Sequence, residues 1–200
     1  TLPAAPASSR GAIMCQIEGQ RWICALGGRG EEAPPGDRSG YLAFARDLRT
    51  PTVHEAIREA HMLEGPVQFV FPESYRRHFD ELTTFPPGLL TVGDALCRFN
   101  PLYAQGMSVA AVEGRQLRSL LQQGASVTEL WRSFFAAASE VIDTAWQLSA
   151  LPDFVFPTTT GERPANLEQL LRFNGALLQL AAEDPEVHRR MVEVNNLVRP

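Results

Sequence analysis

The sequence has little of several features that mark common classes of protein. Its three cysteines, Cys15, Cys24 and Cys97, are too few and too widely spaced for a disulfide framework. No Cys-x-x-Cys pair or histidine cluster has the spacing of metal ligands, so no metal site is expected. We interpret the cysteines as buried thiols of a protein that works in a reducing cytoplasm.

Concentrated positive charge and long apolar runs are also missing. The net charge is −5, and the densest basic groups are the pairs Arg76-Arg77 and Arg189-Arg190, whereas nucleic-acid binding requires a clustered basic surface. No run of about 18 apolar residues occurs, so no transmembrane segment is expected. The opening TLPAAPASSRG lacks the basic start and apolar centre of a signal peptide. It is typical of a loop, and we expect the chain to begin inside a larger protein.

Short strands and short helices are predicted for the first part of the chain. GAIMCQIEGQRWICALGG, residues 11–28, predicts a hairpin with a two-residue loop at Glu18-Gly19, in which Ile17 lies opposite Gln20. In that register one face of the hairpin would be apolar. That face would consist of Ile13, Cys15, Ile17, Trp22, Cys24 and Leu26.

A further strand is predicted at PVQFVFP, residues 66–72, where aromatic residues alternate to one side. Before it, amphipathic spacing predicts two short helices, over residues 37–48 and 50–63. Trp22, Phe69 and Phe71 would then lie on sheet faces. There they would either line an apolar substrate pocket or pack in a core, and the sequence leaves both interpretations open.

The most unusual stretch lies between an apolar run and a helix. LLTV, residues 89–92, lacks alternation and so predicts a strand buried on both faces of a parallel sheet. An irregular loop follows, and then a helix from about Gly106 to Gln122. In open α/β sheets, ligands bind beyond the carboxyl ends of such strands. A plain strand-to-helix connection, with Asp94 as a cap, explains the same residues equally well.

Each residue type at this junction suits a ligand. Gly93 allows another group to approach the backbone closely, and Asp94 can accept hydrogen bonds from the hydroxyls of a sugar or polyol. Pro101 stiffens the loop. The backbone N–H groups of residues 106–108 would lie at the positive end of a helix dipole, which favours an electron-rich oxygen or a developing anion.

Helices are predicted for the rest of the chain, over about residues 126–150, 166–182 and 185–197. The expected fold class is therefore α+β or α/β. Its expected parts are an antiparallel substrate-domain sheet over residues 1–86, a strand–loop–helix element over residues 87–122, and a helical C-terminal region over residues 123–200.

LLTVGDALCRFNPLYAQGMSVAAVEGRQL, residues 89–117, resembles the second flavin-binding motif of the group A FAD-dependent monooxygenases. This family comprises aromatic hydroxylases and squalene-epoxidase-like enzymes. Its motif combines Gly-Asp-Ala, a proline and Gly-Gln-Gly-x-Asn-x-Ala with an acidic residue further along the helix. The matching positions, without insertion, are Gly93, Asp94, Ala95, Pro101, Gln105, Gly106, Ala110, Glu113 and Leu117. Weaker similarity to members with a helical C-terminal part extends over most of the chain.

The resemblance implies a role for each matched residue. Asp94 would bind a ribityl hydroxyl of FAD, and Pro101 would lie near the flavin ring. Backbone N–H groups of residues 105–107 would face the pyrimidine edge of the isoalloxazine, and the helix would stabilise negative charge on the reduced flavin. The implied cofactor-binding set is Gly93, Asp94, Pro101, Ala104, Gln105, Gly106, Met107 and Ser108.

The resemblance also implies an activity. The enzyme would be an NAD(P)H-using flavoprotein oxidoreductase, a hydroxylase or epoxidase that acts on an apolar small molecule and molecular oxygen through a flavin C4a-hydroperoxide. Because the flavin itself carries the oxygen chemistry, no catalytic acid or base is expected in this chain. A non-redox cyclase or binding scaffold of a biosynthetic pathway is the alternative.

The chain departs from the family pattern at several positions. Ala104 stands where the family usually has glycine, Ser108 stands where it has asparagine, and Leu96-Cys97 replaces Ala-His. The Gly-x-Gly-x-x-Gly unit that binds the ADP half of FAD is missing, and GGRGEE at residues 27–32 leads into a Pro-rich loop instead of a helix. We therefore expect a C-terminal portion that is inactive by itself, with the N-terminal FAD-binding portion of the same protein as its partner.

Hydrolysis is a weaker rival. Residues 106–110 resemble a nucleophile elbow around Ser108, with His188 as a base. That elbow needs a strand immediately before the serine and a glycine two residues after it, where this chain has Ala110. The sequence therefore disfavours a hydrolase.

Overall fold

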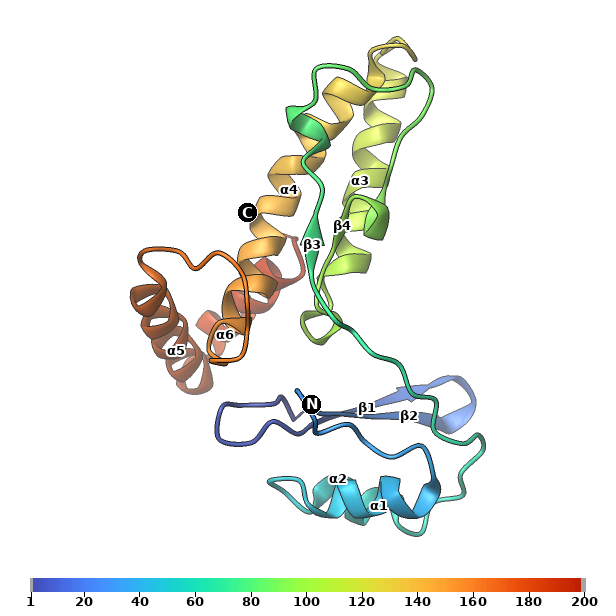
Figure 1. Cartoon of the computed structure of the whole chain (residues 1–200), viewed down its shortest axis with the longest axis vertical. Coiled ribbons are helices and arrows are strands. Elements are labelled where there is room, and N and C mark those ends of the chain that lie inside the picture. The colour runs from blue at the N-terminus through green and yellow to red at the C-terminus, as the bar shows by residue number, and fades with distance from the viewer. Residues whose placement is uncertain (1, 199–200) are drawn as a thin grey trace. The chain divides into compact units, whose positions relative to one another are not determined.

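The computed structural model describes residues 2–198 and has a mixed α/β fold. Over that range it contains six α-helices and two small antiparallel sheets of two strands each. The chain divides into two compact units, one reaching to Phe71 and the other beginning at Pro72 (Figure 1). The prediction of strands and short helices first and long helices later is confirmed. The division between the units lies before residue 86, where the first boundary was expected.

The first unit is built on a hairpin whose loop is one residue longer than expected. β1 (Gly11–Ile17) and β2 (Arg21–Gly27) pair antiparallel with Ile17 opposite Arg21, and the turn η1 (Glu18–Gln20) connects them. The expected pairing of Ile17 with Gln20 is therefore wrong by one residue. Because side chains alternate along a strand, this shift moves the side chains of one strand to the opposite face.

The register decides which hairpin residues are buried. Met14 lies opposite Cys24 and Ala12 opposite Leu26, and these four residues belong to the apolar cluster of the first unit. Trp22 is 58% exposed. The expected apolar face, which combined Ile13, Cys15 and Ile17 with Trp22, Cys24 and Leu26, is not formed.

Two short helices complete the core of the first unit. They are α1 (Arg38–Arg46) and α2 (Thr52–Ile57), and the second is shorter than predicted. Asp37 caps α1, because its carboxylate accepts a hydrogen bond of 2.9 Å from the backbone N–H of Gly40. The buried centre of this unit consists of Ala12, Phe44, Ala45, Leu48 and Val53.

Residues 66–72 do not form the strand that their pattern predicts. Within residues 2–198 no strand pairs with them, and the side chains of Val67, Phe69 and Val70 are 86%, 79% and 84% exposed. A strand needs a neighbouring strand to accept and donate its backbone hydrogen bonds. The apolar alternation is therefore present without the pairing that would turn it into a sheet.

The second unit begins with a minimal sheet. β3 (Tyr75–Arg76) and β4 (Cys97–Arg98) pair antiparallel over two residues each. The chain between them contains the turns η2 (Phe79–Glu81) and η3 (Gly93–Ala95). LLTV at residues 89–92 is irregular, and Leu89 and Val92 are half exposed. The predicted parallel strand is wrong for this chain, because no described strand lies beside it to form a parallel sheet.

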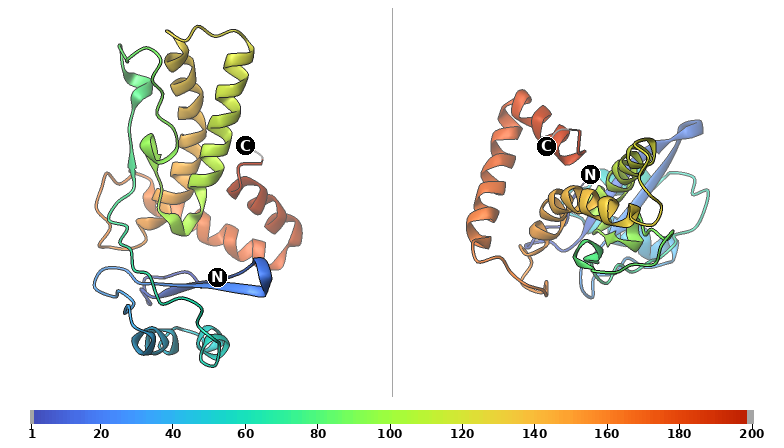
Figure 2. Two further views of the ribbon diagram at one scale, coloured as in Figure 1. Left: turned by 90° about the vertical axis from the view of Figure 1, so that its right-hand side faces the viewer. Right: turned by 90° about the horizontal axis from the view of Figure 1, so that it is seen from above.

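An antiparallel helical hairpin supports the second unit. α3 (Gln105–Gln122) and α4 (Leu130–Asp153) lie side by side in all views (Figures 1 and 2). Both predicted helices are confirmed to within a few residues. One face of α4 is buried along its length, through Leu130, Trp131, Phe134, Phe135, Ala138, Ile142, Ala145 and Ser149. Phe85 adds an aromatic contact, with its ring centroid 5.0 Å from that of Phe135.

A second helical hairpin ends the chain. It consists of α5 (Leu167–Glu183) and α6 (Pro185–Asn195), as the sequence predicts. Asp184 caps α6 by accepting hydrogen bonds from the backbone N–H groups of Glu186 and Val187. None of the helices within residues 2–198 has both the length and the apolar character needed to cross a membrane.

Candidate functional site

The Gly-Asp-Ala turn is tied to α3 by a buried carboxylate. Gly93 adopts φ +57°, a left-handed conformation that favours glycine. Its backbone N–H donates a hydrogen bond of 2.7 Å to Oε2 of Glu113, which lies in the middle of α3 and is fully buried. This bond fixes the position of the turn relative to the helix.

The environment of Glu113 opposes its ionisation. Burial raises the pKa of this carboxyl, and the hydrogen bond from Gly93 offsets only part of that effect. No hydrogen-bond partner of its Oε1 is found within the described part of the chain. Glu113 therefore acts as a buried support for the turn, in a role that the sequence pattern did not specify.

Asp94 combines an anchored backbone with an exposed side chain. Its carbonyl oxygen accepts a hydrogen bond of 3.0 Å from the hydroxyl of Tyr75. Its carboxylate lies at the start of α3, because a Cβ built on Gly106 would stand 3.8 Å from Oδ1 of Asp94. The carboxylate and the first turn of the helix therefore converge at the surface.

The loop between β4 and α3 folds around Asn100. Its side-chain oxygen accepts a hydrogen bond of 3.1 Å from the backbone N–H of Leu102, which shapes the turn η4 (Pro101–Tyr103). Ala104 then adopts φ 55° and ψ 25°, the left-handed region that costs a non-glycine residue about 1 kcal/mol. The departure from glycine at position 104 therefore falls on a backbone conformation that glycine adopts without this cost.

The amino end of α3 is open. Among the residues that the structure describes, no side chain caps the helix, which begins at Gln105, and its first backbone N–H groups have no acceptor within the helix. Met107 is 83% exposed, whereas Gly106 and Ser108 are half-buried. Gln105 is buried and points away from solvent, because its Nε2 donates to the backbone oxygens of Tyr103 and Asn195 at 3.3 and 2.9 Å. Most of the predicted cofactor-binding residues thus lie around one short turn and one helix start.

Asp153, the last residue of α4, contacts this loop, and the sequence analysis did not identify it. Its carboxylate accepts hydrogen bonds from Nδ2 of Asn100 at 2.9 and 3.2 Å and from the hydroxyl of Tyr103 at 3.0 Å. The contact joins residues about fifty positions apart. No local sequence pattern predicts this contact. The one available signal is that a carboxylate at the carboxyl end of a helix is unfavourable, which indicates a compensating partner.

The three cysteines differ in burial, although all three were expected to be buried. Cys97 is buried beside β3, and burial raises the pKa of its thiol to about 12, so it stays protonated at neutral pH. Cys24 is half-buried, and burial raises the pKa of its thiol as well. Cys15 is exposed because it lies on the outer face of the hairpin, and the expectation of a buried thiol is wrong there.

The predicted substrate-pocket residues lie in the first unit. Trp22 and Phe69 are exposed, and Phe71 is half-buried. Two hollows lie elsewhere, one along α3 from Gly114 to Gln122 and one between α5 and α6, and Trp22, Phe69 and Phe71 line neither of them. The assignment of Trp22, Phe69 and Phe71 to a substrate pocket stays a prediction.

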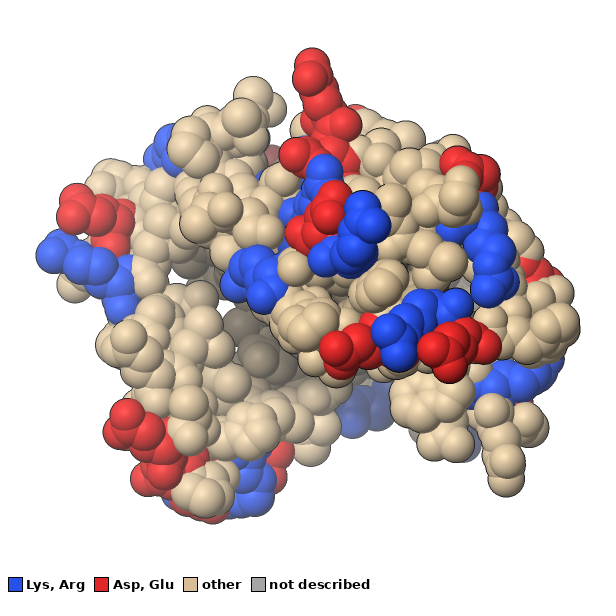
Figure 3. All heavy atoms as spheres, turned by 90° about the horizontal axis from the view of Figure 1, so that it is seen from below, with Lys and Arg blue, Asp and Glu red and all other residues tan. Residues whose placement is uncertain are grey.

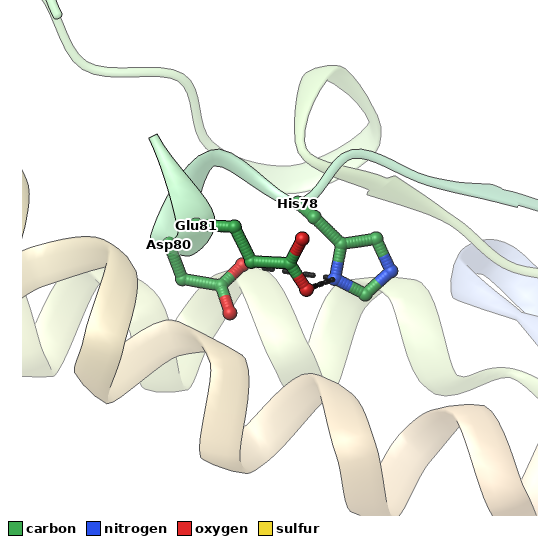
Figure 4. A group of neighbouring side chains, drawn as sticks. All are labelled: His78, Asp80 and Glu81. Atoms are coloured by element: carbon green, nitrogen blue, oxygen red, sulfur yellow. Dashed lines mark ion pairs between the residues drawn. The ribbon is translucent and has the colours of Figure 1, made fainter. Parts of the chain in front are cut away.

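His78, Asp80 and Glu81 form a surface group with metal-ligand chemistry (Figure 4). Nδ1 of His78 lies 3.4 Å from Glu81 and 3.9 Å from Asp80, and the three ligand atoms lie within 4.8 Å of one another. All three residues are exposed, and Asp80 also accepts a hydrogen bond from Ser139. These contacts explain why the three side chains lie together at the surface, and we assign no metal to them.

The basic pairs are engaged with neighbouring groups. Arg189 and Arg190 both pair with Glu186 on α6, at 2.6 and 2.9 Å, and the pKa of Glu186 falls to about 2 because of these two guanidinium groups. Arg76 pairs with Asp143. On the face drawn in Figure 3, Arg side chains likewise lie in small groups next to Asp and Glu.

Comparison with known proteins gives a distant relative. No protein-family model matches the chain. The chain is 28% identical over 152 residues to Protein Rv3254 of Mycobacterium tuberculosis, a name that states no activity. The match covers 75% of this chain and 32% of the relative, so the chain spans about a third of the length of the curated relative it matches.

Proposed function

We propose that this chain is the C-terminal portion of an FAD-dependent, NAD(P)H-using monooxygenase that hydroxylates or epoxidises an apolar small molecule. The single observation that carries the proposal is the convergence of three elements of the motif. The carboxylate of Asp94, the uncapped start of α3 and the Gly93 turn meet at one place, and Glu113 holds the turn against the helix.

The donors at this place suit the flavin end of FAD. The first backbone N–H groups of α3 lie at the positive end of the helix dipole, where they favour an electron-rich oxygen or negative charge. The exposed carboxylate of Asp94 can accept hydrogen bonds from ribityl hydroxyls. Met107 is exposed and Gly106 has no side chain, so a planar ring can approach the backbone there. When bound, the flavin supplies the redox and oxygen chemistry.

The roles of the protein residues follow from their contacts. Asp94 orients the ligand, the start of α3 stabilises negative charge, and Pro101 limits the motion of the loop. Glu113 and Gly93 keep the turn in place. We assign no proton transfer to these side chains and name no catalytic acid or base.

The test uses the natural full-length protein. We expect it to be purified with bound FAD, to show a flavin absorbance spectrum, and to oxidise NAD(P)H faster when an apolar substrate is added. Asp94→Ala should weaken FAD binding about tenfold or more, because a charged acceptor is lost from a ligand hydrogen bond. Glu140→Gln, an exposed carboxylate on α4, serves as the control.

Three results would count against the proposal. Unchanged FAD occupancy in Asp94→Ala would remove Asp94 from the site. A full-length protein that stays colourless after addition of FAD would overturn the flavoenzyme assignment, and one that binds FAD without using NAD(P)H would favour the non-redox scaffold.

A further inference from the structure

Asp153 occupies a position that is unfavourable for a carboxylate. It is the last residue of α4, where the partial negative charge of the helix dipole repels an anion. The side chain is half-buried and turns toward the loop that precedes α3. A contact that offsets this repulsion is therefore expected.

The contact is made with the loop of the proposed flavin site. Nδ2 of Asn100 donates to both carboxylate oxygens of Asp153, and the hydroxyl of Tyr103 donates to Oδ1. Asn100 is only 6% exposed, so its amide depends on protein partners. The two donors lie on either side of Pro101 and Leu102, so Asp153 holds both ends of the turn η4.

The turn η4 determines where α3 begins. Asn100 bonds the N–H of Leu102 with the other end of its side chain, and the backbone oxygen of Tyr103 accepts from Gln105. Between these bonds lies Ala104, whose left-handed backbone directs the chain into the helix. A continuous series of contacts therefore runs from Asp153 to the first N–H groups of α3.

We propose that Asp153 is a positioning residue for the flavin-facing start of α3, and that it acts through Asn100 and Tyr103. This inference rests on the proposed function for its ligand, whereas the positioning of the loop can be measured without a ligand. The C-terminal helical region thereby contributes to the site through one carboxylate, although it contains none of the motif residues.

The pair offers a swap that keeps a hydrogen bond between positions 100 and 153 and the bonds from Leu102 and Tyr103. Asp153→Asn removes the charge and one acceptor, and Asn100→Asp places two carboxylates face to face. In the double variant, Asp at position 100 can accept from Asn at position 153 and from the N–H of Leu102, and Asn at position 153 can still accept from Tyr103. Glu140→Gln on the same helix is the matched control.

The experiment measures FAD affinity and hydrogen exchange of the amides of residues 102–107 in the full-length protein. We expect each single variant to bind FAD about tenfold more weakly and to exchange these amides faster, because hydrogen bonds to a charged group are lost. The double variant should recover most of the FAD affinity and most of the protection of these amides from exchange. A structural role confined to the end of α4 would not be rescued by the change at position 100.

Each outcome decides the inference. Wild-type affinity and exchange in Asp153→Asn would overturn it, as would a double variant no better than the single ones. If the wild-type protein binds no FAD, the proposed function fails, and the exchange rates in the swap series still decide whether Asp153 positions the loop.

Discussion

The two units differ in what they bury. The second unit encloses a continuous aromatic core along α4 and also contains the four buried polar residues found within residues 2–198, namely Asn100, Gln105, Glu113 and Ser149. The first unit has a small core of five residues, and the apolar side chains of Trp22, Ile23, Val67, Phe69 and Val70 stay exposed. Polar groups can find partners within a short chain, whereas an apolar strand needs a further strand or layer beside it.

The largest expected effect is on the free energy of unfolding, when one phenylalanine from each unit is replaced by alanine. Phe134 is fully buried in α4, so Phe134→Ala should lower the free energy of unfolding by about 3–5 kcal/mol. Phe69 is 79% exposed, so Phe69→Ala in this 200-residue chain should change it by less than about 0.5 kcal/mol. Denaturant unfolding of both variants measures the difference, and equal losses would show that the contrast between the units is wrong.

The second prediction concerns the buried carboxyl of the second unit. Because the folded pKa of Glu113 is raised above its ordinary value, the folded state binds the proton more tightly than the unfolded state. The stabilising contribution is complete below the ordinary pKa of about 4.3 and is lost as the pH rises through the folded pKa. Glu113→Gln should remove this part of the pH dependence of unfolding, and Glu140→Gln should keep it. An unchanged pH profile in Glu113→Gln would contradict the raised pKa.

The smallest expected effect concerns the left-handed Ala104. Ala104→Gly removes a backbone cost of about 1 kcal/mol but adds flexibility to the unfolded chain, so a net stabilisation of about 0.5 kcal/mol is expected. Ala111→Gly, at an exposed position inside α3, should instead destabilise by about 0.5–1 kcal/mol. Thermal unfolding of the two variants shows whether each substitution raises or lowers stability. A loss of stability in both would contradict the left-handed conformation at Ala104.

Helices could be predicted from this sequence better than strands. The apolar spacing within α3, α4, α5 and α6 is local, and each helix satisfies its own hydrogen bonds. The segments 66–72 and 89–92 carry strand patterns, but a strand is completed only by partners that the pattern does not name. The hairpin register failed for a related reason, since a three-residue loop and a two-residue loop differ by one position that propensity does not resolve.

The candidate site could be predicted in its exposed part only. Asp94 and the start of α3 follow from the motif and lie together in the structure. The supporting contacts were not predictable, although Glu113 is a motif position, because Glu113 reaches back to Gly93 and Asp153 reaches back to Asn100 across long stretches of chain. Such contacts depend on how α3 and α4 pack, and a single sequence does not encode that packing in any local pattern.

The exposed segment at residues 67–70 has a practical consequence for handling the chain. Val67, Phe69 and Val70 form a short, uncharged, β-prone stretch, which is the composition that pairs with copies of itself. We expect the isolated chain to aggregate with increasing concentration. A charged residue in place of Phe69 should keep it in solution.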